Sequence, residues 1–414
     1  MQIDQSMARL QSFNSCSAPF TRFRMLITNQ NDFDSVCTRM AQAGVIAFDT
    51  EFVSESYYRP KLCLLQLAFG EEVVAVDPFL VEDLTAWWEI MADEQNTILV
   101  HGGREEVRFC QFAINKPPQK LIDVQIAEGL RSRGYPLSYT NLVSRVLRHK
   151  LQHAKETRTD WERRPLSEQQ IEYALDDVRH LEKIWQRQQA GLGEQGRLEW
   201  ALSECQAFVD HVSAEHAQNG WLKLPGYSRL KGRELLASQE LYQWRASVAE
   251  RQNRPQRRVF RDDMLIEIAK RPPTSEKDMK LIRGMNRRDY QSHMPDLLDV
   301  IQRVNDVPRD QLPEQESAPQ NPSQDDVLAK ILGLALANRC EQLGMSTSLV
   351  GTMSDLKQLI RWYVFEHDEE GTPSLLCGWR GEVFGQELKD VLDGKITLRV
   401  TDPKSPNPIQ FEVD

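Results

Sequence analysis

The sequence lacks any long apolar run. Its 414 residues contain no uninterrupted apolar stretch near the roughly 18 residues that a helix needs to cross a bilayer. The first 25 residues also lack the basic start and the apolar middle of a secretory signal peptide. We therefore expect a cytoplasmic protein with no membrane-bound part.

Cysteine is also scarce. The seven cysteines are odd in number, lie far apart and form no CxxC pair. This spacing favours neither a disulfide framework nor a zinc site. We expect small, buried thiols.

Net positive charge is absent as well. The net charge of −10 argues weakly against a nucleic-acid binder, but a sum over the whole chain hides local patches. Between Arg229 and Tyr290 there are 16 Lys and Arg residues against 9 Asp and Glu. One segment is therefore distinctly basic.

The composition and length indicate a globular protein of two to four domains, with 40% hydrophobic and 27% charged residues. Apolar runs predict strands at 45–52, 62–70, 71–78 and 97–103, with a helix at 84–92. Three strands in succession, followed by alternation of strand and helix, predict a mixed sheet flanked by helices. From residue 141 to about 216 the chain reads as helical.

Beyond this region the pattern becomes purely helical. Short helices between 235 and 305 are enough for a compact bundle. Residues 306–324 combine proline, serine, glutamine and acidic residues with almost no apolar content, which predicts a linker. A second helical unit is expected over 325–414.

Two carboxylates follow the apolar strand Val45–Phe48. Asp49 and Glu51 are two residues apart, and strand side chains alternate, so both can face one site. An acidic turn after a buried strand is the ordinary alternative. Unpaired carboxylates beside a core are costly without a cation, however.

A second candidate group lies on a helix predicted over Ile171–Trp185. Ser167 and Gln170 form a capping box at its start, and apolar residues recur at three- and four-residue steps. Tyr173 and Asp177 are four residues apart and share another face of this helix. A surface hydrogen bond and two parts of one site are both compatible with this spacing.

Divalent cations would explain the two groups together. Mg²⁺ takes oxygen ligands, usually one or two carboxylates with phosphate and water. Two such ions can hold a phosphodiester between attacking and leaving oxygens. Asp49, Glu51 and Asp177 would supply three carboxylates, and Tyr173 would orient the water.

The motifs resemble a known family. "FDTEF", "YYRPKLCLLQLA", "VHGGREEVRFC", "TDWERRPL" and "YALDDV", in this order, are similar to the ribonuclease D family of DEDD-type 3′→5′ exonucleases, in the subgroup whose third motif has Tyr. The resemblance implies an N-terminal extension at 1–20 and an α/β, ribonuclease H-like exonuclease domain at 21–215, with a mixed sheet flanked by helices. Two all-α HRDC-like domains would follow, at 235–305 and 325–414.

The resemblance also implies the roles of individual residues. Asp49, Glu51, Glu106 and Asp177 would bind two divalent cations, Mg²⁺ or Mn²⁺, and Tyr173 would complete the catalytic set. His101 would help to shape the site, or would simply cap a strand end. Asp176 would be exposed, or would lie outside the metal ligands.

Two positions depart from the family pattern. Glu106 stands where the family has Asp, with no Asp nearby to replace it, and Glu is longer by about 1.5 Å. A Lys expected shortly before "TDW" falls on Ala154, with Lys155 one residue late. Lys155 could substitute for it in binding nucleic acid.

The basic segment predicts RNA contacts at Arg254, Arg257, Arg258 and Phe260, with Arg251 and Arg261 nearby. Arginines would bind phosphates and aromatic rings would stack on bases, although such bundles often bind only protein. The implied function is metal-dependent trimming of RNA 3′ ends, with tRNA precursors as substrates and nucleoside 5′-monophosphates as products. A DNA 3′→5′ exonuclease, and a degenerate member that binds RNA without cutting it, are the alternatives.

Overall fold

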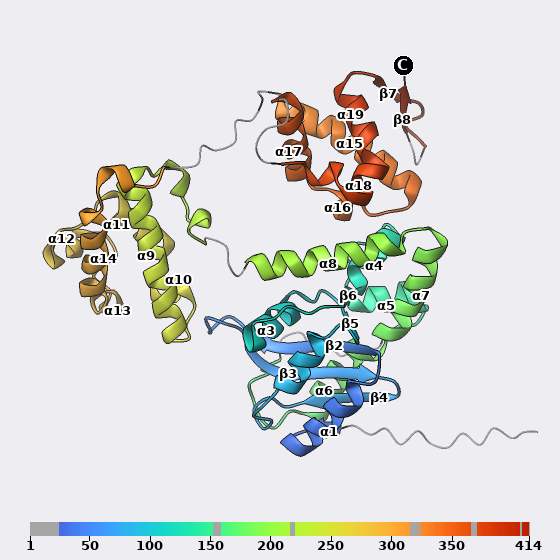
Figure 1. The fold of residues 1–414 in the computed structure, drawn as a ribbon, viewed down its shortest axis with the longest axis horizontal. Coiled ribbons are helices and arrows are strands. Elements are labelled where there is room, and N and C mark those ends of the chain that lie inside the picture. The colour runs from blue at the N-terminus through green and yellow to red at the C-terminus, as the bar shows by residue number, and fades with distance from the viewer. Residues whose placement is uncertain are drawn as a thin grey trace, which may run out of the picture.

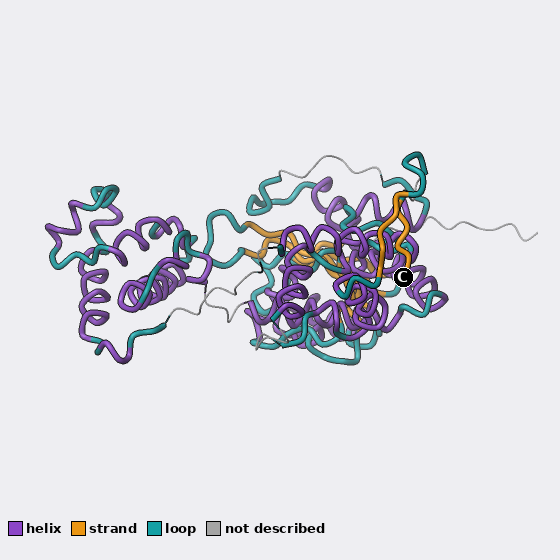
Figure 2. Tube along the Cα trace, turned by 90° about the horizontal axis from the view of Figure 1, so that it is seen from above, coloured by secondary structure: helices purple, strands orange, loops and turns teal. Residues whose placement is uncertain are grey.

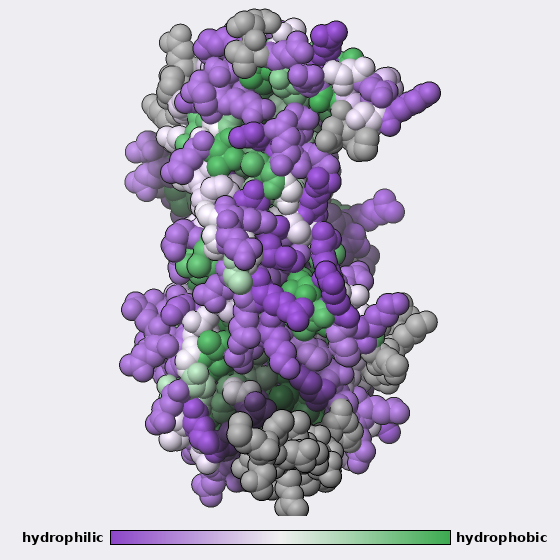
Figure 3. Space-filling view, turned by 90° about the vertical axis from the view of Figure 1, so that its right-hand side faces the viewer, coloured by the Kyte–Doolittle hydropathy of each residue, from purple (hydrophilic) through white to green (hydrophobic). Residues whose placement is uncertain are grey.

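The computed structural model describes residues 25–151, 159–215, 220–314, 322, 324–365, 371–405 and 408–413. The predicted N-terminal extension, Ala154, Lys155 and much of the predicted linker lie outside these residues. No helix in the described ranges is long and apolar enough to cross a membrane. The face drawn in Figure 3 is mainly hydrophilic, and its apolar side chains form small separate patches.

A mixed sheet forms the centre of the first domain, as predicted, and it has six strands, of which the first and the last were not predicted. Its strand order is β1-β4-β3-β2-β5-β6. Strand β3 pairs antiparallel with β2 and β4, while the β1–β4, β2–β5 and β5–β6 pairs are parallel. The strands are β1 (Met25–Ile27), β2 (Val45–Val53), β3 (Lys61–Phe69), β4 (Glu72–Val76), β5 (Thr97–Val100) and β6 (Leu121–Asp123).

Helices cover both faces of this sheet (Figure 1). On one face, α1, α2 and α3 bury large side chains such as Phe33, Trp87 and Val107. On the other, α4, α5, α6 and α7 pack against residues that include Ala47 and Leu64. The helices are α1 (Gln30–Met40), α2 (Thr85–Met91), α3 (Arg104–Ile114), α4 (Val124–Arg131), α5 (Tyr139–Leu147), α6 (Glu168–Arg179), α7 (Leu181–Glu194) and α8 (Leu198–Glu215).

The strand predicted over 45–52 is confirmed as β2, whereas one predicted helix is divided. Asp49 and Glu51 lie within β2 and do not follow it, because β3 pairs with β2 as far as Val53. The helix predicted over 171–185 is two helices that meet at His180, whose φ of −109° and ψ of −5° end α6. The apolar stripe divides between two cores, since Leu175 packs with β3 and β4 residues whereas Leu181 packs with α4 and α5 residues.

The second unit is an all-helical bundle with its own core, in which Leu241, Phe260 and Tyr290 are buried. In Figure 2 its helices stand apart from the rest of the chain. Its elements are η1 (Gly220–Lys223), η2 (Tyr227–Arg229), α9 (Gly232–Arg251), α10 (Gln256–Val259), α11 (Asp262–Lys270), α12 (Glu276–Leu281), α13 (Arg288–Gln291), α14 (Met294–Asp306) and η3 (Arg309–Gln311).

The third unit is not all-α, which corrects the prediction. It ends in an antiparallel pair of strands, because 396–400 and 409–413 alternate β-branched or aromatic residues with polar ones. Its elements are α15 (Asp325–Leu343), α16 (Thr347–Val350), α17 (Met353–Val364), η4 (Ser374–Leu376), α18 (Gly378–Arg380), the π-helical turn η5 (Gly381–Gly385), α19 (Gln386–Leu392), β7 (Ile396–Val400) and β8 (Ile409–Val413).

The third unit shares a continuous hydrophobic core with the exonuclease domain. It lies above α8 in Figure 1. Trp200 of α8 stacks on Trp379 with ring centroids 5.2 Å apart, and the Arg197 guanidinium donates to the Leu343 carbonyl oxygen at 2.8 Å. This unit is therefore part of the packed body of the chain.

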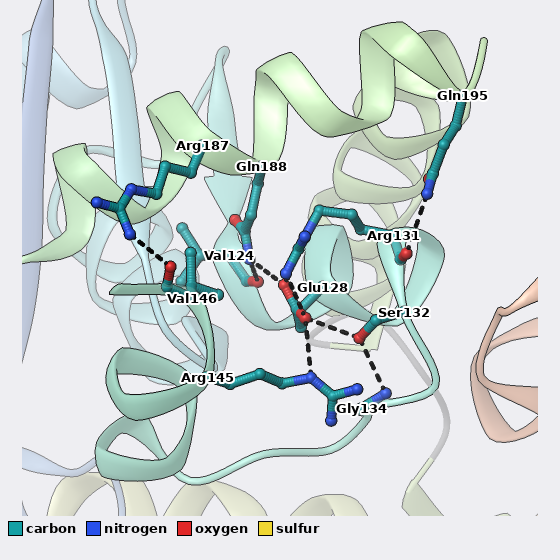
Figure 4. A network of polar contacts seen from close by, with 10 residues as sticks. All are labelled: Val124, Glu128, Arg131, Ser132, Gly134, Arg145, Val146, Arg187, Gln188 and Gln195. Carbon is teal, nitrogen blue, oxygen red and sulfur yellow. Dashed lines mark hydrogen bonds and ion pairs between the residues drawn. The ribbon is translucent and has the colours of Figure 1, made fainter. Parts of the chain in front are cut away.

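A buried carboxylate on α4 joins helices of the first domain (Figure 4). Glu128 accepts hydrogen bonds from Arg131 at 2.9 Å, Ser132 Oγ at 2.7 Å and Gln188 Nε2 at 3.1 Å. Arg145 Nε lies 3.5 Å from the same carboxylate. The network joins α4, α5 and α7 behind the site.

Candidate active site

Strand β2 holds the first two carboxylates. It pairs with β5 only over Val45–Ala47, so beyond Ala47 one edge of the strand is no longer covered by β5. Asp49 and Glu51 share the strand face of Ala47 by alternation, and this face is covered by α6 and α7. Both carboxylates therefore point toward the helices that follow later in the chain.

Helix α3 brings Glu106 to the same place. Glu106 lies in the first turn of α3 and is only 5% exposed. The Thr50 hydroxyl, on β2, donates to its Oε1 at 2.6 Å. The side chain thus reaches the strand that carries Asp49 and Glu51.

Helix α6 contributes Tyr173 and Asp177. The predicted capping box is confirmed, since Ser167 and Gln170 each bond the other's backbone. Tyr173 and Asp177 are both partly buried, and the Tyr173 ring lies 6.4 Å from the Trp161 ring between centroids. The two side chains share the helix face that was expected from their spacing.

The segment before α6 is anchored to the sheet. Arg164 Nε donates to Asp77 Oδ2 at 2.6 Å, and its other nitrogens donate to Asp77 Oδ1 and the Cys63 carbonyl oxygen. Lys61 Nζ and the Tyr57 hydroxyl both donate to Glu162. Much of the "TDWERRPL" motif therefore acts to place Trp161 and the start of α6.

Burial raises the pKa of all four carboxylates, and the charges of neighbouring carboxylates add to this for three of them. Burial, followed by the charges of Asp49, Asp177 and Glu106, raises the pKa of Glu51 to about 9. Burial raises the pKa of Asp177 to about 7. The pKa values of Asp49 and Glu106 are raised mainly by burial, and then by Asp177 and by Asp49 respectively. Their mutual repulsion places all four in one electrostatic site.

The Tyr173 hydroxyl belongs to this site. Burial and the charges of Asp177, Glu51 and Asp49 raise the pKa of Tyr173 to about 12. The phenol is therefore protonated at neutral pH. It can donate a hydrogen bond to a water or to a phosphate oxygen.

The site carries more negative charge than the described side chains neutralise. Among the described residues, no Lys or Arg side chain lowers the pKa of any of the four carboxylates. In the described ranges, no three His, Cys, Asp or Glu side chains lie in an arrangement that could hold a metal ion as they stand. Carboxylate oxygens are the ligands that divalent cations prefer, so these four groups are the donors that such ions would use.

Asp123 was missed by the sequence analysis. It is 3% exposed, and its carboxylate accepts from the backbone N–H groups of Gly102 at 3.0 Å, Gly103 at 3.2 Å and Gln125 at 2.9 Å. Gly103 precedes α3, so Asp123 sets the entry angle of the helix that carries Glu106. Asp is a common N-cap residue, so its position between the end of a strand and the start of a helix could have indicated this role.

Tyr139 was also missed. Its hydroxyl donates to the Asp176 carbonyl oxygen at 2.9 Å. The Asp177 and Asp49 charges add to burial in raising the pKa of Tyr139. Its ring lies beneath the turn of α6 that carries Asp177, and no local pattern in the sequence indicated this contact.

The remaining single-residue predictions have different outcomes. His101 follows β5, and its Nε2 lies 2.9 Å from the Leu137 carbonyl oxygen, so it contacts the segment before α5. Its role in shaping the site stays a prediction. Asp176 is partly exposed and pairs with Arg179, outside the carboxylate group. Lys155 lies outside the described residues.

The prediction that Phe260 contacts RNA is wrong. Phe260 is 0% exposed and packs in the helical bundle with its centroid 4.5 Å from that of Tyr290. Its apolar ring is removed from solvent, so no base can stack on it. Arg254, Arg257 and Arg258 are exposed, and their contact with RNA stays a prediction.

Comparison with known proteins agrees with this geometry. A 3′-5′ exonuclease family model matches residues 25–190, and an HRDC domain model matches residues 235–301. The ribonuclease D of Gluconacetobacter diazotrophicus is 30% identical over 380 residues, which cover 91% of this chain and 94% of the relative. This chain belongs to the ribonuclease D family. The ribonuclease D of Nitrobacter hamburgensis is 29% identical and covers 91% of this chain and 97% of its own.

A solved structure of the ribonuclease D family supports the arrangement of the whole chain. The crystal structure of Escherichia coli RNase D, described as an exoribonuclease involved in structured RNA processing, has a TM-score of 0.79 and 26% identity. It covers 90% of this chain, which spans 99% of that one. The present ribonuclease D family member is therefore a hydrolase of the 3′→5′ exoribonuclease class, with an exonuclease domain followed by an HRDC domain.

Proposed function

We propose that this exoribonuclease trims the 3′ ends of structured RNA, with tRNA precursors among its substrates, in a reaction that needs divalent cations. The observation that carries the proposal is that β2, α3 and α6 bring four buried or partly buried carboxylates together. Glu106 of α3 accepts from Thr50 of β2, α6 packs on β2, and the charges of Asp49, Asp177 and Glu106 act on neighbouring carboxylates. The processing of structured RNA by the similar Escherichia coli enzyme supports the substrate class. The second HRDC-like domain, over 325–414, stays part of the proposal.

Asp49, Glu51, Glu106 and Asp177 would hold two divalent cations, Mg²⁺ or Mn²⁺. When bound, these ions would neutralise the phosphodiester and lower the pKa of the attacking water. The carboxylates fit because their oxygens are the ligands that such ions prefer. Their excess of negative charge has no described Lys or Arg partner to compete for them.

Tyr173 would orient the attacking water through its hydroxyl. The phenol is protonated at neutral pH, because its pKa is raised to about 12. Water oxygen would form a bond to the terminal phosphorus, and the bond from phosphorus to the 3′ oxygen of the preceding nucleotide would break. The 3′ oxygen leaves with a proton, and the product is a nucleoside 5′-monophosphate.

Glu106 favours an active enzyme over a degenerate RNA-binding protein. Its carboxylate lies in the charge field of Glu51 and Asp49. The Thr50 hydroxyl, on the strand that carries Asp49 and Glu51, donates to its Oε1 at 2.6 Å. The longer side chain therefore reaches the site that the family's Asp would serve.

The test is release of labelled 5′-mononucleotide from a tRNA precursor and from an unstructured RNA of equal length. Each is incubated with Mg²⁺, Mn²⁺ or a chelator. We expect metal-dependent release from both, with faster release from the tRNA precursor. Tight RNA binding without release under any metal condition would instead identify a binding protein. Release that continues in chelator would contradict the metal requirement.

A further inference from the structure

A cleft of about 610 Å³ lies between the exonuclease domain and the HRDC domain. The loop between β2 and β3 and helix α3 form one wall, with Tyr58 and Arg108 among their lining residues. The HRDC domain forms the other wall, with Lys223, Arg245 and Arg257. In Figure 1 the tip of the β2–β3 loop reaches toward the end of α9 and α10.

The two walls are joined by a small polar contact. Arg59 pairs with Glu250 at 2.5 Å, and both side chains are substantially exposed. Tyr58 packs against the edge of the HRDC core. This contact is much smaller than the continuous hydrophobic core between the first domain and the third unit. It leaves the cleft open along the rest of the boundary.

The lining of the cleft is basic in a chain that is acidic overall. Five Lys or Arg residues line it, against two acidic residues. Arg257 has 81% of its side chain exposed, although it lies 2.8 Å from Asp262, and Lys223 is exposed. A strip of positive charge therefore stands in a protein of net charge −10.

One buried donor in the cleft lacks a partner. Arg245 is 2% exposed, and its Nη1 donates to the Phe260 carbonyl oxygen at 2.9 Å and to Asp262 at 2.6 Å. Its Nε is buried and, within the described residues, has no hydrogen-bond acceptor. A buried guanidinium N–H without an acceptor is unfavourable. Because the whole side chain is enclosed, Arg245 fixes Asp262 on this wall and does not itself reach a strand in the cleft.

The cleft borders the carboxylate site through α3. Glu105 lines the cleft, while the next residue, Glu106, accepts from Thr50 in the site. The β2–β3 loop begins after Val53, two residues beyond Glu51. A strand whose terminal phosphodiester lies in the site therefore has a short path into the cleft.

We propose that this cleft binds the sugar-phosphate backbone of single-stranded RNA immediately upstream of the 3′-terminal nucleotide. The inference rests on the proposed function and adds the place where the RNA strand leaves the site. Lys223 and Arg257, which are exposed, supply the phosphate contacts. Of the exposed arginines predicted from the sequence, Arg257 lines the cleft, whereas Arg254 and Arg258 are not among its lining residues.

The test compares two double variants of the full chain. Lys223→Gln with Arg257→Gln removes two charges from the cleft. Lys277→Gln with Arg288→Gln removes two exposed charges from the same domain, away from the cleft. Unfolding curves for both variants verify that the fold is kept.

The first readout is RNA binding in chelator, so that no substrate is consumed. Each phosphate contact contributes about 0.7 to the slope of log affinity against log salt for single strands, so the cleft variant should lose about 1.4. The control variant should keep the wild-type slope. Equal slopes in all three proteins, or an equal loss in both variants, would overturn the proposal.

The second readout is turnover of RNAs of different length with metal present. For an unstructured oligoribonucleotide, the cleft variant should raise KM about tenfold with kcat unchanged. A dinucleotide without a 5′-phosphate has no phosphate upstream of the scissile one, so its kinetics should not change. A rise in KM for the dinucleotide of the same size would contradict an upstream subsite.

A third arm separates a strand site from a small-anion site. Inorganic phosphate and 5′-AMP are titrated against the wild type and the cleft variant. Loss of 5′-AMP binding in the variant, with RNA binding intact, would make the cleft a mononucleotide site and would overturn the proposal. If the wild type cleaves no RNA at all, the proposed function fails. The salt slopes would still show whether the cleft binds the RNA backbone.

Discussion

Two walls enclose the carboxylate site, and they are built differently. Asp49 and Glu51 stand on β2, where backbone pairing with β3 sets their positions. Glu106 and Asp177 stand on helices α3 and α6, which reach the site from loops. The strand wall is held by a continuous ladder of hydrogen bonds, whereas the helix wall depends on a few side-chain contacts.

The contacts of the helix wall are specific and few. Asp123 holds the backbone before α3 through Gly102 and Gly103, and Arg164 holds the segment before α6 through Asp77. The difference teaches that a change of length, such as Glu for Asp at position 106, is more easily accommodated on the helix side. Substitutions in the strand wall should therefore cause a larger loss of activity than substitutions in the helix wall.

The largest effect is expected from Asp49→Asn on the strand wall. Loss of this carboxylate should lower the rate of mononucleotide release about 10³-fold, equivalent to about 4 kcal/mol of transition-state stabilisation. The metal-free variant should nevertheless unfold at an equal or higher temperature, because one repelling charge has gone. The rate of mononucleotide release checks the first expectation, and the unfolding temperature in the absence of metal checks the second. If the Asp49→Asn enzyme kept the wild-type rate, the Asp49 carboxylate would have no part in the reaction.

Tyr173→Phe should have the next largest effect. Removing the hydroxyl should lower kcat about 10²-fold and leave KM unchanged, because the phenol acts on the water and not on binding. Tyr139→Phe is the control, since the Tyr139 hydroxyl donates to the backbone of α6, at the Asp176 carbonyl oxygen. Equal losses of kcat in the two variants would indicate that Tyr173 has a structural role and does not act on the water.

Asp123→Asn tests the support of the helix wall. An amide nitrogen would face backbone N–H groups, so we expect a loss of about 1–3 kcal/mol in the free energy of unfolding. We also expect about a tenfold loss of kcat, partly recovered at higher Mn²⁺, because a 1 Å misplacement of Glu106 is costly. Asp83→Asn, which weakens a bond to the Thr85 N–H at the start of α2, should leave the metal dependence unchanged.

Glu106→Asp should change activity by less than about tenfold, and downward, because the shorter side chain loses the Thr50 bond. The rate of mononucleotide release at several metal concentrations measures this. A faster Glu106→Asp enzyme would show that Glu at this position lowers the rate of the wild-type enzyme. Activity present only in Glu106→Asp would show that the wild-type site is disabled.

The smallest effect concerns thermal stability and pH. The folded pKa values of Glu51, about 9, and Asp177, about 7, lie above their unfolded values, so the folded state binds more protons. Metal-free stability should therefore fall as the pH rises from about 4 to about 9. Mn²⁺ binds the ionised carboxylates, so its stabilisation should grow over the same window. Unfolding curves at several pH values, with and without Mn²⁺, test this, and a pH-independent effect of Mn²⁺ would contradict it.

The sequence by itself determined the local features. Strands β2 to β5 of the first domain, the capping box of Ser167 and Gln170, and the shared helix face of Tyr173 and Asp177 all follow from patterns over a few residues. Such patterns act through backbone propensity and burial of one face. They are therefore readable without knowledge of the partner element. The strand pair β7–β8 was readable in the same way, but the resemblance to a helical domain concealed it.

Only the tertiary structure decided how distant segments meet. It divided one apolar stripe between two cores at His180, paired β2 with β3 and buried Phe260 against Tyr290. It also placed Asp123 beneath the start of α3 and opened a basic cleft beside α3. Each of these outcomes depends on contacts between segments far apart in the chain, because burial and pairing are properties of both partners and a local pattern describes only one.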